Sequence, residues 1–520
     1  MEIPLTPLEF SRRARKLYGD RIAVIDGDLK YTYRQFFDRC DRWSYALQQL
    51  GIMQGDRVAY IANNTHAQLE AFYSVPQIGA ILVPVNYRLS AEEFAYIINH
   101  SGAVAVCVHS DYLKVVESIQ NQLPGVEHFI ALEEEREGWA SYEKLIKRSR
   151  TKYMPVDIQE QDLITINYTS GTTAQPKGVM ITHRNAYMNS IGALVHFNLS
   201  VKERYLWTLP MFHANGWTFV WTITACGGTH VCLRKTDAQS IFHLINRENI
   251  TLFCAAPTVL IGIVNAPEKL RRQAHSGIRV ITAGAPPAAA TIERVENELG
   301  WELIQVYGLT ETAPFISICE ALPEHRHLSL SESAVIKARQ GVELITSGEL
   351  IVIDEEDNEV PHDGNTMGEI VTRGNVVMKG YYNDPEATNK VLVNGWFHTG
   401  DMAVIHPDGY IEVRDRIKDV IISGGENISS VEVEAVLLRH PSVKEAAIVG
   451  MPHGKWGQSP HAFVVLHQGH MLTEDDLKLF VGQHLASFKK PQWVTFVKEL
   501  PKTATGKIQK YVLRGGRSNL

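Results

Sequence analysis

The sequence lacks the cysteine patterns of zinc-binding and disulfide-rich proteins, because its six cysteines are scattered and form no CxxC pair. No segment reaches the ~18 consecutive apolar residues of a membrane-spanning helix, and the opening segment MEIPLTPLEF lacks the basic and apolar regions of a secretory signal. Basic residues are not in excess either. The formal net charge is −7, which gives nucleic-acid binding no global electrostatic support. We therefore expect a cytoplasmic protein with no membrane span and no nucleic-acid partner.

At 520 residues the chain exceeds the length at which one hydrophobic core keeps growing, so two or more domains are expected. Its first third alternates between helical and strand patterns, with a helix capped by Thr32 and apolar strands at 58–62 and 81–85. Similar apolar stretches, each ending in a loop rich in Gly, Pro, His or Asn, follow at 206–210, 252–255 and 280–283. This alternation predicts an α/β fold of mostly parallel sheets packed with helices, with ligands at the carboxyl ends of the strands.

The pattern changes near residue 360, where short strands are punctuated by glycines. After Gly425 the order becomes helix, strand, strand, helix, strand, which predicts a compact α+β domain of about 100 residues. A charged stretch at 416–419 separates two apolar strands. We therefore expect an N-terminal domain at 1–415, a hinge at 416–418 and a C-terminal domain at 419–520.

The segment YTSGTTAQPKG (168–178) places glycines, small hydroxyl side chains and one lysine directly after an apolar strand at 163–167. Glycines let backbone N–H groups converge on an anion, hydroxyls add donors, and Lys177 supplies a positive charge. This context favours a phosphate-binding loop over a Ser/Thr-rich surface turn. The segment is not a Walker A loop, in which the lysine follows the second glycine, so a P-loop ATPase is the weaker interpretation.

This loop resembles the phosphate loop of the adenylate-forming superfamily, which comprises acyl- and aryl-CoA synthetases, luciferases and nonribosomal adenylation domains. Four further motifs occur in the order of that superfamily: YGLTE (307–311), GWFHTGD (395–401), DRIKDVIISGGENI (415–428) and PKTATGK (501–507). The resemblance spans nearly the whole chain and is closest to the short- and medium-chain fatty acyl-CoA ligases. It implies a large N-terminal domain with a distorted β-barrel subdomain, and a small mobile C-terminal lid domain. One departure is Ala174, where many members have glycine.

The resemblance places the nucleotide on residues whose chemistry suits it. Tyr307 would lie against adenine, and Asp401 would accept hydrogen bonds from the ribose hydroxyls with help from Arg416. Thr310 would touch the α-phosphate, and Glu311 would hold Mg²⁺, a hard cation that prefers carboxylate oxygen. Taken alone, YGLTE would be an ordinary strand end and TGD an ordinary turn. The implied ATP-binding residues are Thr169, Ser170, Gly171, Thr172, Thr173, Lys177, Gly284, Ala285, Pro286, Tyr307, Asp401 and Arg416.

Lys507 is the expected catalytic cation. Attack of a carboxylate on the α-phosphate brings two anions together, and a lysine between them stabilises the transition state most. The alternative is a solvated lysine in a C-terminal tail. The other expected catalytic residues are Thr310, Glu311 and His213.

The acceptor thiol is expected to be coenzyme A. By resemblance, the small domain turns about a hinge at Lys418, so that one pose inserts Lys507 and the other presents Gly424 and Gly425 to the pantetheine arm. Phe488 and Lys489 would meet the CoA nucleotide. Lys489 begins a segment from 489 to 517 that is rich in basic residues, which suits the phosphates of CoA, although such a run is usually a solvated face.

The acid pocket is expected around His213, Trp217, Gly308 and Phe315. Acetate-restricted relatives have a tryptophan where Gly308 stands, which implies a deeper pocket here. Trp217 resembles an aromatic gate of long-chain synthetases, but it can equally be a core aromatic residue. Phe315 can also line an aromatic-acid site, so the acid stays open.

The sequence thus predicts an acid:CoA ligase that forms AMP and pyrophosphate from Mg²⁺-bound ATP and acts on short- to medium-chain fatty acids, with a homodimer as a candidate assembly. No enzyme nucleophile is needed, in agreement with the lack of a GxSxG elbow. The alternatives are an aryl or long-chain acid CoA ligase, or an adenylating enzyme with another acceptor. A P-loop ATPase and a non-catalytic nucleotide-binding module are further alternatives from other classes.

Overall fold

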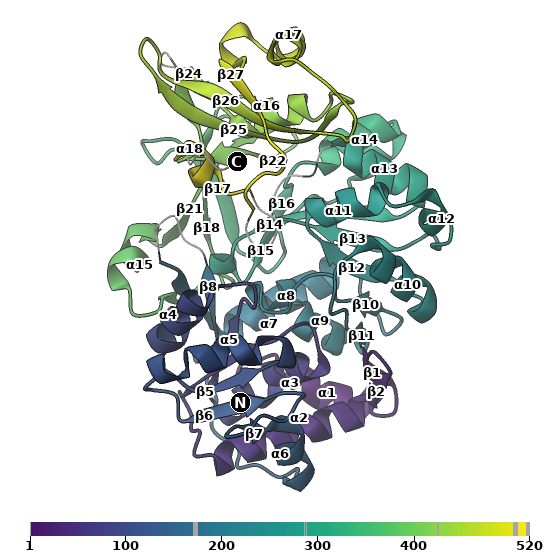
Figure 1. The fold of residues 1–520 in the computed structure, drawn as a ribbon, viewed down its shortest axis with the longest axis vertical. Helices are drawn as coiled ribbons and strands as arrows, with labels where there is room; N and C mark the ends of the chain where they lie inside the picture. The colour runs from purple at the N-terminus through teal and green to yellow at the C-terminus, as the bar shows by residue number, and fades with distance from the viewer. Residues whose placement is uncertain are drawn as a thin grey trace.

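The structure is a computed structural model that describes residues 2–169, 175–284, 287, 289–423, 426–502 and 508–515. Two large sheets lie side by side, a smaller antiparallel sheet adjoins them, and the C-terminal segment forms a separate layer above (Figure 1). The fold is therefore α/β with a smaller α+β part, as the sequence predicts.

The first large sheet has the strand order β19-β9-β8-β4-β3-β5-β6-β7. The strands from β8 to β7 are parallel, whereas β9 and β19 join its edge in antiparallel pairs. Its strands are β3 (Arg57–Ile61), β4 (Ile81–Val85), β5 (Ala103–Val108), β6 (His128–Ala131), β7 (Ala140–Ser141), β8 (Leu163–Thr169), β9 (Lys177–Thr182) and β19 (Gly380–Tyr381). The helices of this part of the chain are α1 (Leu8–Tyr18), α2 (Tyr33–Gln49), α3 (His66–Ser74), α4 (Ala91–Ser101), α5 (Leu113–Ser118), α6 (Tyr142–Arg148) and α7 (His183–His196).

The second large sheet has the strand order β16-β15-β14-β13-β12-β10-β11-β1-β2 and is parallel from β14 to β1. Its strands are β1 (Ile22–Asp26), β2 (Leu29–Thr32), β10 (Arg204–Leu206), β11 (Thr229–Val231), β12 (Leu252–Ala255), β13 (Arg279–Thr282), β14 (Glu302–Gly308), β15 (Phe315–Ile318) and β16 (Val342–Glu343). The helices of this part are α8 (Ala214–Trp217), α9 (Phe219–Cys226), α10 (Ala238–Glu248), α11 (Pro257–Val264), α12 (Glu268–Arg271), α13 (Ala289–Leu299) and α14 (Leu330–Lys337).

In each large sheet one strand marks a reversal point, because the chain adds the next strand on one side of it and the following strand on the other: β4 and β5 flank β3, and β11 and β12 flank β10. Ligands in open α/β sheets bind at the carboxyl ends of such strands. Asn64, three residues after β3, donates from Nδ2 to the carbonyls of Trp207 (2.8 Å) and Leu209 (2.9 Å), and its Oδ1 accepts from the Met211 N–H (2.9 Å). The two reversal points are therefore joined directly, and the loop after β10 is fixed at their junction.

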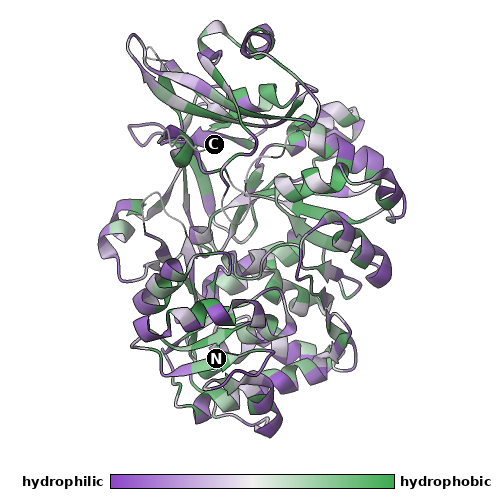
Figure 2. Cartoon of the chain, in the orientation of Figure 1, coloured by the Kyte–Doolittle hydropathy of each residue, from purple (hydrophilic) through white to green (hydrophobic). Residues whose placement is uncertain are grey.

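Local sequence signals account for the helix positions. Thr32 caps α2 by accepting from the Gln35 N–H, and Gln35 returns a bond to the Thr32 N–H, which completes a capping box. Phe36, Cys40, Trp43 and Leu47 are buried along one face of this helix, as their spacing predicts. Apolar colour is concentrated on the strands, and polar colour on the outward sides of helices such as α10 and α12 (Figure 2).

The smaller sheet is antiparallel and corresponds to the predicted distorted-barrel part. Its strands are β17 (Glu349–Ile353), β18 (Gly368–Arg373), β20 (Leu392–Val393), β21 (Trp396–Ile405) and β22 (Ile411–Arg416), with α15 (Pro385–Val391) beside them. The long strand β21 pairs with β18 on one side and with β22 on the other. This pairing places Asp401 opposite Arg416.

The C-terminal part has the order helix, strand, strand, helix, strand after its first hairpin. Its elements are β23 (Ile421–Ser423), β24 (Glu426–Ile428), α16 (Ser430–Leu437), β25 (Val443–His453), β26 (Gly457–Leu466), α17 (Glu474–His484), β27 (Trp493–Phe496) and α18 (Lys510–Arg514). It contacts the preceding sheet through buried Asp415, whose Oδ2 accepts from the Ser430 N–H at 2.5 Å.

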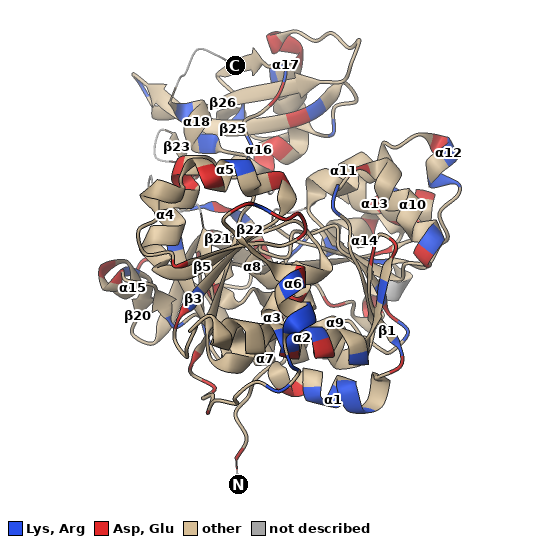
Figure 3. Ribbon diagram, turned by 60° about the horizontal axis from the view of Figure 1, so that its bottom comes forward, with Lys and Arg blue, Asp and Glu red and all other residues tan. Residues whose placement is uncertain are grey.

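Charge is distributed over the outer helices rather than separated by sign. Figure 3 shows acidic and basic bands on the same helices, for example α2 and α10. Within the described ranges no helix is long and apolar enough to cross a membrane.

Candidate active site

The predicted phosphate loop connects two paired strands. β8 and β9 are antiparallel neighbours, with Thr169 opposite Lys177. Near the loop end of this hairpin the hydroxyl of Tyr168 lies 2.7 Å from His100 Nδ1. The predicted loop residues Ser170, Gly171, Thr172 and Thr173 lie outside the described residues.

Tyr381, which the sequence analysis missed, lies between two of the predicted residues. Its hydroxyl donates to Glu311 Oε1 at 2.9 Å, and the Lys177 ammonium lies 4.9 Å from the centre of its ring. Burial raises the pKa of the Tyr381 hydroxyl, and the neighbouring Glu311 carboxylate raises it further, so this hydroxyl remains a donor. The Glu311 carbonyl also accepts from the Met378 N–H at 2.8 Å. The short strand β19 thus links the lysine of the phosphate hairpin to the carboxylate of the YGLTE loop.

The predicted ribose-binding group forms a connected set. The Tyr307 hydroxyl donates to Asp401 Oδ2 at 2.8 Å, and Arg416 Nε lies 3.2 Å from Asp401 Oδ1. Burial raises the pKa of Tyr307 well above its usual value, and the Asp401 carboxylate adds to this effect. Gly284, at the expected adenine loop, is exposed and has a φ of +90°, whereas Ala285 and Pro286 lie outside the described residues. An aromatic ring, a carboxylate and a guanidinium held together in this way can bracket a nucleoside.

Glu369 positions the turn that carries Asp401. Its carboxylate accepts from the Gly400 N–H at 2.9 Å and lies 2.9 Å from His398 Nδ1. Gly400 has a φ of +72°, a conformation in which glycine is favoured. Glu369 was not predicted because it lies far from the TGD motif in sequence and carries no motif of its own.

The expected acid-pocket residues follow β10. His213 precedes a run of five residues with positive φ, 214–218, of which only Gly216 is a glycine. A left-handed backbone costs about 1–2 kcal/mol for each non-glycine residue. Trp217 is buried in this turn, and its ring lies 5.9 Å from the Phe315 ring at an angle of 69°. The structure therefore brings Trp217 and Phe315, two of the expected acid-pocket residues, into contact.

Asn189 on α7 connects this site to the YGLTE loop. Its Nδ2 donates to the carbonyls of Phe315 (2.7 Å) and Thr312 (3.3 Å). Because α7 begins where β9 ends, the helix after the phosphate hairpin fixes both the acid-pocket wall and the loop that holds Thr310 and Glu311. The nucleotide and acid residues thus share one scaffold.

Packing alone requires a glycine at position 308, whatever its effect on the acid pocket. A Cβ at this position would lie 1.9 Å from the Pro314 carbonyl oxygen and 2.9 Å from the Phe315 Cα. Both neighbours are backbone atoms and cannot rotate away. The greater pocket depth expected from this glycine stays a prediction.

The predicted CoA and hinge residues are described only in part. Lys489 forms an ion pair with Glu432 at 2.6 Å, and Phe488 is 42% exposed. Lys418 follows β22 and has its pKa lowered by desolvation and then by the nearby Arg416 charge. Lys507, Gly424 and Gly425 lie outside the described residues, so their predicted roles stay predictions.

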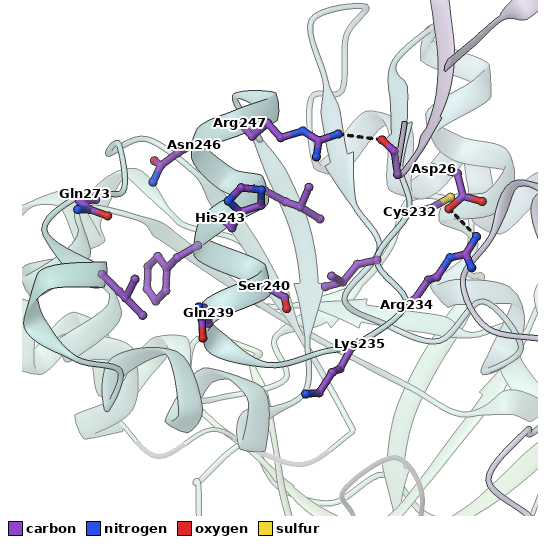
Figure 4. Close-up of a pocket in the computed structure, with 15 residues that line it drawn as sticks. Asp26, Cys232, Arg234, Lys235, Gln239, Ser240, His243, Asn246, Arg247 and Gln273 are labelled. Carbon is purple, nitrogen blue, oxygen red and sulfur yellow. Dashed lines mark hydrogen bonds and ion pairs between the residues drawn. The ribbon is translucent and has the colours of Figure 1, made fainter. Parts of the chain in front are cut away.

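A cavity of about 840 Å³ lies elsewhere, at the carboxyl ends of β1 and β11 beside α10 (Figure 4). It is lined in part by Arg234 and Arg247, which bind Asp26 (3.4 Å) and the Gly27 carbonyl (2.8 Å) respectively. None of the predicted site residues lines it. This cavity is therefore separate from the residues that the sequence predicts for the active site.

Among the described residues, no group of three or more His, Cys, Asp or Glu side chains could hold a metal ion. Mg²⁺ in nucleotide sites is usually bound by one or two carboxylates together with substrate phosphates and water. A single oriented carboxylate, as Glu311 provides, fits that requirement.

The Lys177–Tyr381–Glu311 contacts and the Tyr307–Asp401–Arg416 set are the arrangement that the resemblance to the adenylate-forming superfamily implies. Comparison with known proteins agrees. The AMP-binding enzyme family matches residues 10–382, and the AMP-binding enzyme C-terminal domain matches residues 432–507. The chain therefore belongs to the AMP-binding enzyme family, which confirms the predicted superfamily.

Relatives are similar over nearly their whole length. The chain is 40% identical over 535 residues to a peroxisomal trans-cinnamate:CoA ligase of Petunia hybrida, covering 98% of this chain and 94% of the relative. It is 42% identical over 521 residues to 4-hydroxybutyrate–CoA ligase 2 of Metallosphaera sedula, with the same coverage. Among solved structures, the anthranilate CoA ligase AuaEII in complex with anthranoyl-AMP matches with a TM-score of 0.89 and 25% identity, covering 99% of this chain and 98% of that one.

Proposed function

We propose that this chain is an AMP-forming acid:CoA ligase that activates short- to medium-chain carboxylic acids. The class of activity is supported by relatives that are named CoA ligases. The observation that carries the proposal is the pair of linked groups, Lys177–Tyr381–Glu311 and Tyr307–Asp401–Arg416.

A carboxylate is a poor electrophile, so the acid must be activated before a thiol can attack its carbonyl. In the first step a carboxylate oxygen of the acid forms a bond to the α-phosphorus of ATP, and the bond to the β-phosphate breaks with loss of pyrophosphate. In the second step the sulfur of CoA attacks the acyl carbonyl and AMP leaves. Lys177 and Thr169 hold the ends of the phosphate loop, and Asp401 with Arg416 binds the ribose.

Mg²⁺ bound with ATP would neutralise charge on the phosphates, and Glu311 is the residue that would hold it. Tyr381 orients this carboxylate through its hydroxyl. Lys507 is proposed to stabilise the charge that develops during the first step. In the second pose of the small domain, Gly424 and Gly425 are proposed to border the pantetheine arm.

An aromatic acid is the second candidate. The edge-to-face pair of Trp217 and Phe315 offers ring surfaces to an aryl group, and one relative is named for cinnamate. Both candidates share the same reaction, so a substrate series separates them.

The proposed domain boundaries are 1–415 and 419–520, with a hinge at 416–418. The change of sheet between β22 and β23 supports this boundary. A homodimer stays a prediction. The cytoplasmic location also stays a prediction, and the petunia relative is named peroxisomal.

The test is acid-dependent exchange of pyrophosphate into ATP, measured with and without CoA, together with detection of acyl-CoA by mass. The proposal expects exchange without CoA and acyl-CoA with it. Asp401→Asn should abolish most exchange, whereas Asp408→Asn, at a surface pair with Arg339, should change it by less than about twofold. ADP and orthophosphate as products, or exchange with no acyl-CoA, would overturn the proposal.

A further inference from the structure

The left-handed turn 214–218 is held by side chains of β8. Positive φ is uncommon for Ala214, Trp217 and Thr218, so a run of such residues persists only where the surroundings impose it. Gly216 cannot be replaced without conflict, because its Cβ would lie 2.4 Å from the Trp207 ring. The turn is therefore fixed by its environment rather than by local preference.

Three side chains form a closed ring of hydrogen bonds around this turn. Thr165 Oγ1 donates to Asn167 Oδ1 (2.8 Å), Asn167 Nδ2 donates to Asn215 Oδ1 (3.1 Å), and Asn215 Nδ2 donates back to Thr165 Oγ1 (2.8 Å). Asn167 Nδ2 also donates to the Phe212 carbonyl (3.1 Å). The three side chains belong to residues no more than 3% exposed, so water cannot replace a lost partner.

The same strand carries the phosphate hairpin. Thr165 and Asn167 lie on β8, which ends at Thr169, and successive alternate residues of a strand share one face. The ring therefore joins the strand that leads to the phosphate loop with the turn that carries Trp217. On the far side, Thr218 Oγ1 lies 2.8 Å from Ser190 Oγ on α7.

The ring of hydrogen bonds lies directly beside Trp217, one of the residues expected to line the acid pocket. Trp217 is 4% exposed and packs edge-on against Phe315, whose carbonyl is held by Asn189. A tryptophan on an ordinary helix could turn aside to admit a longer chain. On this clamped turn the backbone of Trp217 cannot shift to carry the indole aside without breaking the ring of hydrogen bonds.

We propose that Asn215, together with Thr165 and Asn167, is a positioning residue that limits the size of the acid by fixing Trp217 against Phe315. This inference rests on the proposed function and names its substrate class, carboxylic acids short or compact enough to stop at the indole. The side chain of Asn215 bonds to Thr165 and Asn167 and to none of the residues expected to bind ATP, so its loss should change acid selectivity more than ATP binding.

The experiment compares kcat/KM for acetate, butyrate, hexanoate, octanoate and benzoate in wild type, Asn215→Gly, Trp217→Ala and the double variant. Glycine accepts the φ of +50° at this position without strain, so Asn215→Gly removes only the two amide bonds. The octanoate-to-butyrate ratio should rise about tenfold in Asn215→Gly. In the Trp217→Ala background the same substitution should change that ratio by less than about twofold, because the two changes act on one element.

Asn249→Gly is the matched control. Asn249 also has a left-handed φ, of +48°, but it ends α10 and takes no part in the ring. It should leave the ratio unchanged. Thr165→Val, which suits a strand and removes the hydroxyl, should reproduce the effect of Asn215→Gly, and Thr165→Ser should restore the wild-type ratio. Thermal unfolding identifies the variants that fold. If Asn215→Gly does not fold, the ratio measured for Thr165→Val tests the inference instead.

The inference is overturned if folded Asn215→Gly and Thr165→Val keep the wild-type ratio, or if the shift is as large in the Trp217→Ala background. A rise in the KM for ATP with an unchanged ratio would also overturn it. If wild type forms AMP from none of the acids, the proposed function itself fails, and that result is distinct from an unchanged ratio in an active enzyme.

Discussion

Replacing Tyr381 by phenylalanine should weaken the response to Mg²⁺ while leaving the Lys177 contact in place. The substitution removes the hydroxyl that donates to Glu311 at 2.9 Å but keeps the ring 4.9 Å from the lysine ammonium. A hydrogen bond to a charged group contributes about 1.5–3 kcal/mol, which corresponds to roughly 10- to 150-fold in an equilibrium or rate constant. Tyr381 is 8% exposed, so solvent does not replace the bond.

The assay is acid-dependent pyrophosphate exchange as a function of free Mg²⁺ at fixed ATP. We expect the half-saturating Mg²⁺ concentration to rise and kcat/KM for ATP to fall by about tenfold or more. Tyr381→Leu also removes the ring from Lys177, which should cost about 0.5–1 kcal/mol more. Tyr382→Phe is the matched control, since the Tyr382 ring lies 6.1 Å from His100, away from Glu311. Equal Mg²⁺ responses in Tyr381→Phe and wild type would refute the reasoning, as would an equal loss in Tyr382→Phe.

Three other predictions concern packing, catalysis and pH. Gly308→Ala should lower the free energy of unfolding by about 1–3 kcal/mol, because its Cβ would meet the Pro314 carbonyl at 1.9 Å, and denaturant unfolding measures the loss. Lys507→Ala should strongly reduce adenylation yet leave thioester formation from supplied acyl-adenylate largely intact. An equal loss of both half-reactions would contradict the proposal that the small domain adopts two poses. Buried His66, bonded to Asp26 at 2.7 Å, has its pKa raised to about 9 despite desolvation. Protonation of His66 therefore stabilises the folded state by about 3 kcal/mol; this contribution is fully present below pH ~6.5 and is lost as pH rises through about 9. The free energy of unfolding should fall over that pH interval, and His66→Asn should make this fall smaller.

Much of the fold could be predicted from local patterns. The stretches at 252–255 and 280–283 became β12 and β13, and the helix capped by Thr32 became α2, because strand and helix periodicity are read directly from neighbouring residues. The helix–strand–strand–helix–strand order after Gly425 also agrees with the structure. The pairing of β1 with β11 could not be predicted, since it joins residues about two hundred positions apart with no motif between them.

The site was predicted only where a motif marks it. Tyr307, Asp401 and Arg416 lie together as expected, because each belongs to a motif of the superfamily. Tyr381 and Asn215 were missed for physical reasons. A tyrosine in a short edge strand carries no local signal of a carboxylate partner, and a left-handed run through Ala and Trp contradicts their intrinsic preferences.

The order of the strands along the chain differs from their order in space. β1 and β2 are made first but complete the edge of the second sheet beside β11, and β19, made late, completes the edge of the first sheet beside β9. No single break in the polypeptide chain would give a fragment that contains every strand of one large sheet and none of the other. A fragment that stops soon after α7 would leave β1 without its β11 neighbour, and one that begins there would lack that edge strand. The two sheets are thus interwoven by the chain, so the enzyme should resist division into separately expressed halves at this point.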